Sequence, residues 1–182
     1  MNLFIDTTQK KCNLAIFNNK IIDYISILTN NNLTDLVIEE INKLLKKNKI
    51  NIKNITSLYL TIGPGSFTGV RIGCIIAKAW FFFNNKIKIF TIDSLLLQLP
   101  WKDGISLLDA RGEKYYLGIF KNNKKIEEFK IISSEEIKKI NKNKICIDYK
   151  NINIFNNLLL HIKNFKIIKP STLLPLYIKP PI

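Results

Sequence analysis

The chain has 182 residues, of which 47% are hydrophobic, so it is long enough and apolar enough to fold around a core as one domain or two small ones. No stretch supplies the ~20 consecutive apolar residues of a membrane span, because the nearest one, Val70–Phe83, is interrupted by Arg71 and Lys78. The net charge of +14 favours either contact with nucleic acid or a general drift of composition toward Lys, Asn and Ile.

The few cysteines and the single histidine limit the chemistry that the chain can perform. Cys12, Cys74 and Cys146 lie far apart in apolar runs, which is typical of small core residues. Their odd number and the lack of a signal peptide predict a cytoplasmic protein. Because His161 is the only histidine, the chain has few of the side chains that a zinc site or a histidine general base needs.

The first half of the chain is predicted to alternate strands and helices. Leu3–Phe17 is typical of two strands joined by a polar turn, with Asp6 at the end of the first strand, and a third strand follows in "NNKIIDYISI". Apolar residues at helical spacing predict a helix over Leu33–Lys47. A strand at Ser57–Ile62, a glycine-rich loop, a helix over Ser66–Phe83 and a strand "KIKIFTI" complete this half.

The loop "GPGSFTGVRIG", Gly63–Gly73, has the strand–turn–helix layout of phosphate-binding loops. A Walker A loop needs Lys and then Ser or Thr after its last glycine, whereas Val70 and Arg71 stand there. The dinucleotide fingerprint fails by one residue of spacing. Two interpretations stay open: the loop contacts phosphate at the helix N-terminus, or its glycines only permit a tight turn and a close helix–sheet approach.

The second half of the chain repeats the first. Ser106–Phe120 aligns without a gap on Leu3–Phe17 and places Asp109 on Asp6. A third strand "NNKKIEEFKII", a capping-box pattern at Ser133, a strand "KICIDY", a helix "NINIFNNLLLHI" and a strand "FKIIK" follow. Internal similarity at such a long period indicates a duplicated unit.

The element order predicts an α/β fold of two ribonuclease-H-like subdomains, at residues 1–100 and 101–182. This topology occurs in the clan of actin, sugar kinases and Hsp70, whose two halves face each other across a cleft. In that clan the Asp after the first strand approaches a metal-bound nucleotide. Here Asp6 and Asp109 are either remnants of such a cleft or residues that bond the backbone of their own turns.

Several motifs in order along the chain resemble the TsaB family, also called YeaZ. They are "LFIDTT", "GPGSFTGVRIG", "IDSL", "LLDARGEKYY" and the tail "LPLYIK". The resemblance implies a partner protein in bacterial tRNA modification, which works with its paralogue TsaD and the ATPase TsaE. Their complex transfers threonylcarbamoyl from threonylcarbamoyl-adenylate to N6 of adenosine 37 in tRNAs that read ANN codons.

The resemblance also implies how the work is divided. ATP and metal belong to the partner subunits, tRNA is reached through the complex, and a homodimer is an alternative assembly. The catalytic paralogue carries a His-x-x-x-His metal motif that a chain with one histidine cannot form, so we expect no catalytic and no metal-binding residue here. The second subdomain is expected to be shortened between "FKIIKP" and "LPLYIK". The residues of the vestigial nucleotide or phosphate cleft would be Asp6, Thr7, Thr8, Gly63, Gly65, Ser66 and Asp109.

The Ser66–Phe83 helix is apolar nearly all round, because its charges Arg71 and Lys78 are seven residues apart and share one narrow line. A helix of this kind must be buried on more than one side. Gly69 and Gly73 are four residues apart and are expected to let a partner helix approach closely. The predicted interface with TsaD, or with a second copy, comprises Phe67, Val70, Arg71, Gly73, Cys74 and Lys78.

Two other classes of function remain open. An active small-molecule kinase or ATPase of the same clan would need an adenosine loop in its second half, where Gly104, Gly112 and Gly118 are the only candidates. An autonomous basic RNA-binding protein would bind tRNA by itself in a salt-dependent manner.

Overall fold

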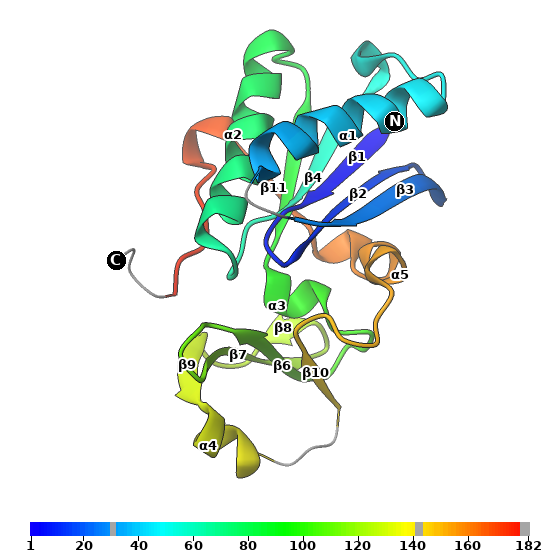
Figure 1. Ribbon diagram of the computed structural model, residues 1–182. Coiled ribbons are helices and arrows are strands. Elements are labelled where there is room, and N and C mark those ends of the chain that lie inside the picture. Colours follow the sequence, from blue (N-terminus) through cyan, green and yellow to red (C-terminus); the bar gives the residue numbers. More distant parts are fainter. Residues whose placement is uncertain (30–31, 141–143, 179–182) are drawn as a thin grey trace.

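The computed structural model describes residues 1–29, 32–140 and 144–178. Two sheets lie one above the other, with the helices α3 and α5 between them and α1 and α2 on the outer face of the larger sheet (Figure 1). No helix in these described ranges is long and apolar enough to cross a membrane. The arrangement places the turns at the ends of several strands around the gap between the sheets.

The larger sheet has the strand order β11-β5-β4-β1-β2-β3. Parallel pairing joins β1 to β4 and β4 to β5, whereas β2 is antiparallel to both β1 and β3. The five strands expected in the first half are confirmed. The strands of this sheet are β1 (Asn2–Asp6), β2 (Lys11–Phe17), β3 (Ile21–Leu28), β4 (Ser57–Thr61), β5 (Lys88–Ile92) and β11 (Lys166–Ile168).

The outer face of the larger sheet is covered by the two long helices that the sequence predicts, α1 (Leu33–Lys47) and α2 (Phe67–Phe83). Apolar side chains of both helices share one core with β1, β2 and β4. Ser66 caps α2, because its side-chain oxygen accepts a hydrogen bond from the Gly69 N–H at 3.3 Å. A short 3-10 turn, η1 (Ile52–Asn54), leads from α1 into β4.

The smaller sheet has the order β10-β6-β7-β8, and β9 also pairs with β7. Ser133 and Glu136 form the predicted capping box at α4 (Ser134–Lys138). The strands of this sheet are β6 (Gly104–Asp109), β7 (Lys114–Lys121), β8 (Lys124–Lys125), β9 (Lys130–Ser133) and β10 (Ile145–Ile147). The remaining elements are α3 (Ser94–Leu97), α5 (Ile154–Leu160), η2 (Ile162–Asn164) and η3 (Pro170–Thr172).

The two matching hairpins are present, but their registers differ by one residue. Asp6 lies opposite Asn13 in the first hairpin, whereas Asp109 lies opposite Tyr115 in the second. The gapless sequence alignment would place Tyr116 there. The second turn is therefore one residue shorter, and the alignment holds for the first strand of each hairpin only.

The place of the strand "FKIIK" in the repeat predicts that it belongs to the second sheet. This prediction is wrong. As β11 the strand pairs antiparallel with β5 and forms an edge of the larger sheet. Burial explains the pairing, because Phe165 and Leu173, on either side of β11 in the sequence, are buried in the two cores that cover the opposite faces of that sheet. The division at residue 100 stays a prediction, with the addition that residues 166–168 return to the first sheet.

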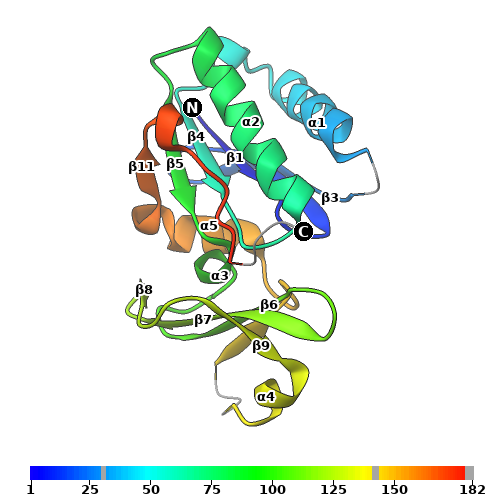
Figure 2. The same ribbon diagram turned by 90° about the vertical axis from the view of Figure 1, so that its left-hand side faces the viewer.

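One core joins the two halves. Phe4 and Phe17 from the larger sheet pack with side chains of α3 and α5 and with Phe120 of the smaller sheet. The C-terminal segment then runs along α2 (Figure 2). At its end the Leu176 N–H donates to the Ile62 carbonyl at 2.7 Å, directly before the glycine-rich loop.

Candidate functional site

The turn between β1 and β2 holds Asp6 inside the protein, where its side chain has no exposed surface. One carboxylate oxygen accepts hydrogen bonds from the Thr8 N–H at 3.0 Å and from the Thr8 hydroxyl at 2.7 Å. The other faces the Asn13 amide nitrogen at 3.5 Å. Burial raises the pKa of Asp6, and these hydrogen bonds oppose the rise. The carboxylate thus holds its own turn, as the turn interpretation predicts.

The glycine-rich loop packs directly on this turn. The Ser66 N–H donates to the Thr8 carbonyl at 2.7 Å, and the Thr7 hydroxyl donates to the Gly69 carbonyl at 2.6 Å. A Cβ atom on Gly65 would collide with the Thr8 carbonyl, and one on Gly69 with the Thr7 carbonyl. The loop and α2 approach this turn so closely that glycine is required at both positions. The phosphate interpretation stays a prediction.

Gly63 stands between β4 and the C-terminal segment. Its φ of +109° is a conformation that only glycine adopts easily, and a Cβ atom there would lie 2.8 Å from the Leu176 carbonyl. Beside it, the Arg71 Nε–H donates to the Tyr177 hydroxyl at 3.0 Å. The Arg71 guanidinium also lies 3.9 Å from the centre of the Phe67 ring. The tail thus packs on the first turns of α2.

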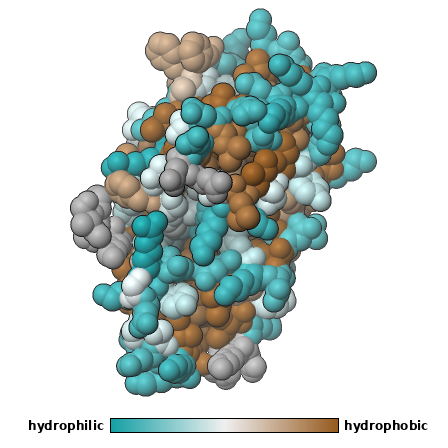
Figure 3. All heavy atoms as spheres, viewed as in Figure 1, coloured by the Kyte–Doolittle hydropathy of each residue, from teal (hydrophilic) through white to brown (hydrophobic). Residues whose placement is uncertain are grey.

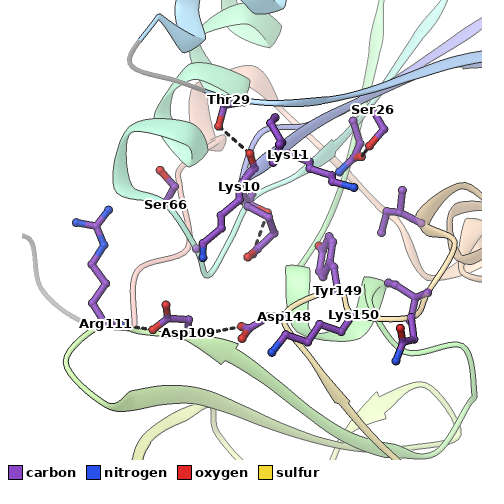
Figure 4. A pocket seen from close by; sticks show the side chains of 18 residues that line it. Lys10, Lys11, Ser26, Thr29, Ser66, Asp109, Arg111, Asp148, Tyr149 and Lys150 are labelled. Carbon is purple, nitrogen blue, oxygen red and sulfur yellow. Dashed lines mark hydrogen bonds between the residues drawn. The ribbon is translucent and has the colours of Figure 1, made fainter.

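A cavity of about 790 Å³ lies between the ends of the two sheets (Figure 4). Asp109 lies at its rim with an exposed side chain. Its carboxylate accepts a hydrogen bond from the Arg111 N–H at 2.7 Å, and its own N–H donates to the Asp148 carboxylate at 2.7 Å. The matched pair Asp6 and Asp109 therefore differs, since one is sealed inside and the other borders solvent.

The structure brings only part of the predicted cleft to this cavity. Thr8, Gly65, Ser66 and Asp109 line it, whereas Asp6, Thr7 and Gly63 do not. The charged and aromatic residues of the rim were not among the residues predicted from the sequence. A signal existed in the repeat, because the turns "TTQKK" and "ARGEK" that follow the matched aspartates are both basic. The rim residues missed are Lys10, Lys11, Arg111, Asp148, Tyr149 and Lys150.

The outward face of α2 carries exposed apolar side chains. Ile75 is 63% exposed and Phe82 is 83% exposed, and apolar spheres protrude at the top left of Figure 3, over the end of this helix. The described residues of the chain leave these side chains without a covering layer. This face comprises Phe67, Arg71, Ile75, Lys78, Phe82 and Phe83, and we call it the α2 face.

Three of the six predicted interface residues face the interior of the protein and not its surface. Val70 and Cys74 are buried in the chain itself, and Gly73 faces the Thr7 hydroxyl, to which a Cβ atom would lie 3.3 Å away. The expectation that Gly69 and Gly73 admit a partner helix is therefore wrong. Both glycines admit the chain's own β1–β2 turn. Phe67, Arg71 and Lys78 are exposed.

The single histidine, His161, and the carboxyl of Asp93 both have local hydrogen-bond partners. His161 is buried, and its Nε2 atom lies 2.7 Å from the Leu99 carbonyl. Burial lowers the pKa of His161. Asp93 caps α3, and burial raises its pKa to about 6. Among the residues that the structure describes, no three His, Cys, Asp or Glu side chains are grouped to hold a metal.

Comparison with known sequences gives the family of the chain. Residues 28–151 match the family described as TsaD, tRNA N6-adenosine threonylcarbamoyltransferase. An uncharacterized protein of Mycoplasma pneumoniae is 35% identical over 99% of this chain and 95% of its own length. The tRNA threonylcarbamoyladenosine biosynthesis protein TsaB of Buchnera aphidicola subsp. Schizaphis graminum is 34% identical over 55% of this chain and 48% of its own length.

Comparison with solved structures supports the fold. YeaZ from Pseudomonas aeruginosa superposes with a TM-score of 0.73 over 97% of this chain and 99% of that chain, at 12% identity. An uncharacterized protein described as having similarity to peptidase YeaZ from Pseudomonas aeruginosa superposes with a TM-score of 0.77 over 98% of this chain and 99% of its own, at 13% identity. At these identities the likeness concerns the fold alone. It confirms the predicted class of two ribonuclease-H-like subdomains.

Proposed function

Because the chain belongs to the TsaB/YeaZ family, we propose that it is a non-catalytic partner subunit in the formation of N6-threonylcarbamoyladenosine in tRNA. In this proposal a TsaD-like paralogue performs the transfer to adenosine 37 of tRNAs that read ANN codons, and a TsaE-like ATPase assists. ATP and metal are assigned to these partners and none to this chain. The subunit would act in the cytoplasm, where its tRNA substrate is found.

The positions of the chain's reactive groups support the non-catalytic role. The Asp6 carboxylate is occupied by the backbone and hydroxyl of Thr8, away from the cavity. His161 is buried against the Leu99 carbonyl. A general acid or base must reach its substrate within hydrogen-bonding distance. Neither group borders the cavity, and Asp109 engages the turn of Arg111 instead.

The proposed partner role rests on the exposed apolar side chains of the α2 face. Three phenylalanines and an isoleucine on it are more than a third exposed, next to two cations. Large apolar side chains clustered on an otherwise polar surface mark protein–protein contacts. The inner side of the helix already packs on the chain's own sheet. We therefore assign this face to the TsaD-like subunit, with a second copy of the chain as its occupant when that subunit is absent.

Calorimetry with the purified TsaD-like protein from the same organism tests the assignment. Ile75→Arg places a charge in the middle of the α2 face and is expected to weaken binding at least about tenfold, or ~1.4 kcal/mol. Ile126→Arg is the matched control, because Ile126 is 59% exposed in the second half and lies off that face. Circular dichroism checks that both variants are folded.

The two variants separate the outcomes. A loss of affinity confined to Ile75→Arg supports the proposal. Equal affinity of the two folded variants removes the α2 face from the interface. Turnover of ATP or modification of tRNA by the purified chain alone would overturn the non-catalytic role and favour an active enzyme of the same clan.

A further inference from the structure

Four cations from three parts of the chain line the cavity between the sheets. Lys10 and Lys11 come from the β1–β2 turn and the start of β2, Arg111 from the β6–β7 turn, and Lys150 from the segment after β10. All four side chains are exposed. None of them takes part in the salt bridges that the structure records among its described residues.

The two carboxylates at the same rim, Asp109 and Asp148, offset two of the four positive charges, and each accepts one hydrogen bond from the backbone. One oxygen of Asp109 accepts the Arg111 N–H, and one oxygen of Asp148 accepts the Asp109 N–H. In Figure 4 these two side chains lie beside each other along the end of the smaller sheet. Ser66, at the start of the 17-residue helix α2, also lines the cavity. The partial positive charge of that helix end adds to the excess of cations.

The two turns that carry Arg111 and Lys150 have unusual backbone conformations. Arg111 has a φ of 64°, and Asp148 and Tyr149, just before Lys150, have φ values of 50° and 56°. Non-glycine residues seldom adopt this left-handed region, and such residues cluster at binding sites. Both turns lie at the rim that faces Lys10. In Figure 4 the Lys10 side chain points across the gap toward the end of the smaller sheet.

The shape of the site favours an extended anion. The cations lie on both rims of an open space of about 790 Å³ and remain exposed to solvent. A site for a small phosphate compound would need buried donors that enclose it. Exposed lysines and arginines instead suit the evenly spaced phosphates of a nucleic acid, where each contact releases counterions. The chain's net charge of +14 favours the same ligand.

We propose that the rim of this cavity binds the phosphate backbone of RNA, with Lys10, Arg111 and Lys150 as contacts. The inference rests on the proposed function for the identity of the RNA, which is then the tRNA that is modified. It adds to that function a direct contact between this subunit and tRNA, formed by both halves of the chain and separate from the α2 face.

Fluorescence anisotropy with a labelled, unmodified tRNA transcript tests the proposal on the full chain. Lys10→Gln/Lys150→Gln is expected to weaken binding about tenfold and to lower the slope of log affinity against log salt by about 2, since each phosphate contact contributes about 1. The matched control is Lys53→Gln/Lys86→Gln, which removes the same charge from exposed lysines that precede β4 and β5, at the opposite end of these strands.

Three results would overturn the proposal. The first is an equal loss in the two double variants, which indicates binding by net charge alone. The second is displacement of tRNA by inorganic phosphate or AMP at an ionic strength where chloride has no effect, which indicates a small-ligand site. The third is unchanged affinity in both Lys10→Gln/Lys150→Gln and Arg111→Gln.

Calorimetry with the TsaD-like protein distinguishes this proposal from the proposed function. The cavity variants are expected to bind that partner with wild-type affinity, because none of the changed residues lies on the α2 face. Loss of tRNA binding with intact partner binding supports a separate RNA site. Failure of wild-type chain to bind the TsaD-like protein would reject the proposed function, and the tRNA measurement would still decide the RNA site.

Discussion

The carboxylate of Asp6 accepts two hydrogen bonds from a single residue, Thr8, one from its backbone and one from its hydroxyl. The same Thr8 hydroxyl lies 3.1 Å from the Ser94 hydroxyl, at the start of α3. The first strand, the glycine-rich loop and the element that leads into the smaller sheet are thus tied together at one buried point. The hydrogen bonds of Asp6 to Thr8 are part of that junction.

Asp6→Asn is expected to leave tRNA modification by the reconstituted complex close to the wild-type level. Asn keeps one oxygen that accepts both hydrogen bonds from Thr8. Asp6→Ala removes that acceptor and is expected to lower the free energy of unfolding by about 1–3 kcal/mol. Urea denaturation followed by circular dichroism measures both variants. A large loss of activity in a stable Asp6→Asn protein would show that the charge itself is used.

The helical glycines Gly69 and Gly73 give a second, internally controlled prediction. Ala gains about 1 kcal/mol of helix propensity over Gly at either position. The difference in unfolding free energy between Gly69→Ala and Gly73→Ala therefore measures what the added methyl group contacts at each position. A Cβ atom on Gly69 would collide with the Thr7 carbonyl, whereas one on Gly73 would lie 3.3 Å from the end of the Thr7 side chain.

Gly69→Ala is therefore expected to be the less stable variant by about 1–3 kcal/mol. Thermal unfolding of the two proteins at the same concentration checks the order. Equal melting temperatures would mean that the turn between β1 and β2 moves aside easily. Because Gly73 faces the interior and Ile75 is exposed, a substitution at Ile75 tests the partner interface and one at Gly73 does not.

The sequence predicts the elements better than it predicts what they face. Periodicity and capping residues place α1, α2 and α4 correctly, because these signals are local. The direction in which Gly73 faces and the pairing of β11 with β5 depend on contacts between distant segments. The basic rim of the cavity was missed for the same reason, since Lys10 and Arg111 are about a hundred residues apart in sequence.

The partly buried carboxyl of Asp93 predicts a dependence of stability on pH. Burial raises its pKa from 3.8 to about 6, so the folded protein binds a proton that the unfolded chain has already released between these values. The stabilisation from this proton is complete below pH 3.8 and is lost as the pH rises through about 6. Its size is at most about 3 kcal/mol, at 1.36 kcal/mol per pKa unit.

Asp93→Asn removes this titration and keeps the cap of α3, since Asn caps helices as well as Asp. The variant is expected to gain stability relative to the wild type as the pH rises from 4 to 7. Urea denaturation of both proteins at each pH gives the comparison. A difference in unfolding free energy that does not change with pH would mean that Asp93 ionises in the folded state at its ordinary pKa.

The C-terminal segment offers a matched pair of neighbouring leucines. Leu173 has no exposed surface and packs in the core under α1 and α2, whereas Leu174 is 66% exposed. Leu173→Ala is expected to lower the free energy of unfolding by about 2–5 kcal/mol, because it leaves a cavity in that core. Leu174→Ala is expected to change it by less than about 0.5 kcal/mol. Denaturant unfolding of the two variants tests whether the tail is part of the fold. Similar small effects in both would mean that the tail leaves the α2 helix in solution, and that Tyr177 does not hold Arg71 beside the α2 face.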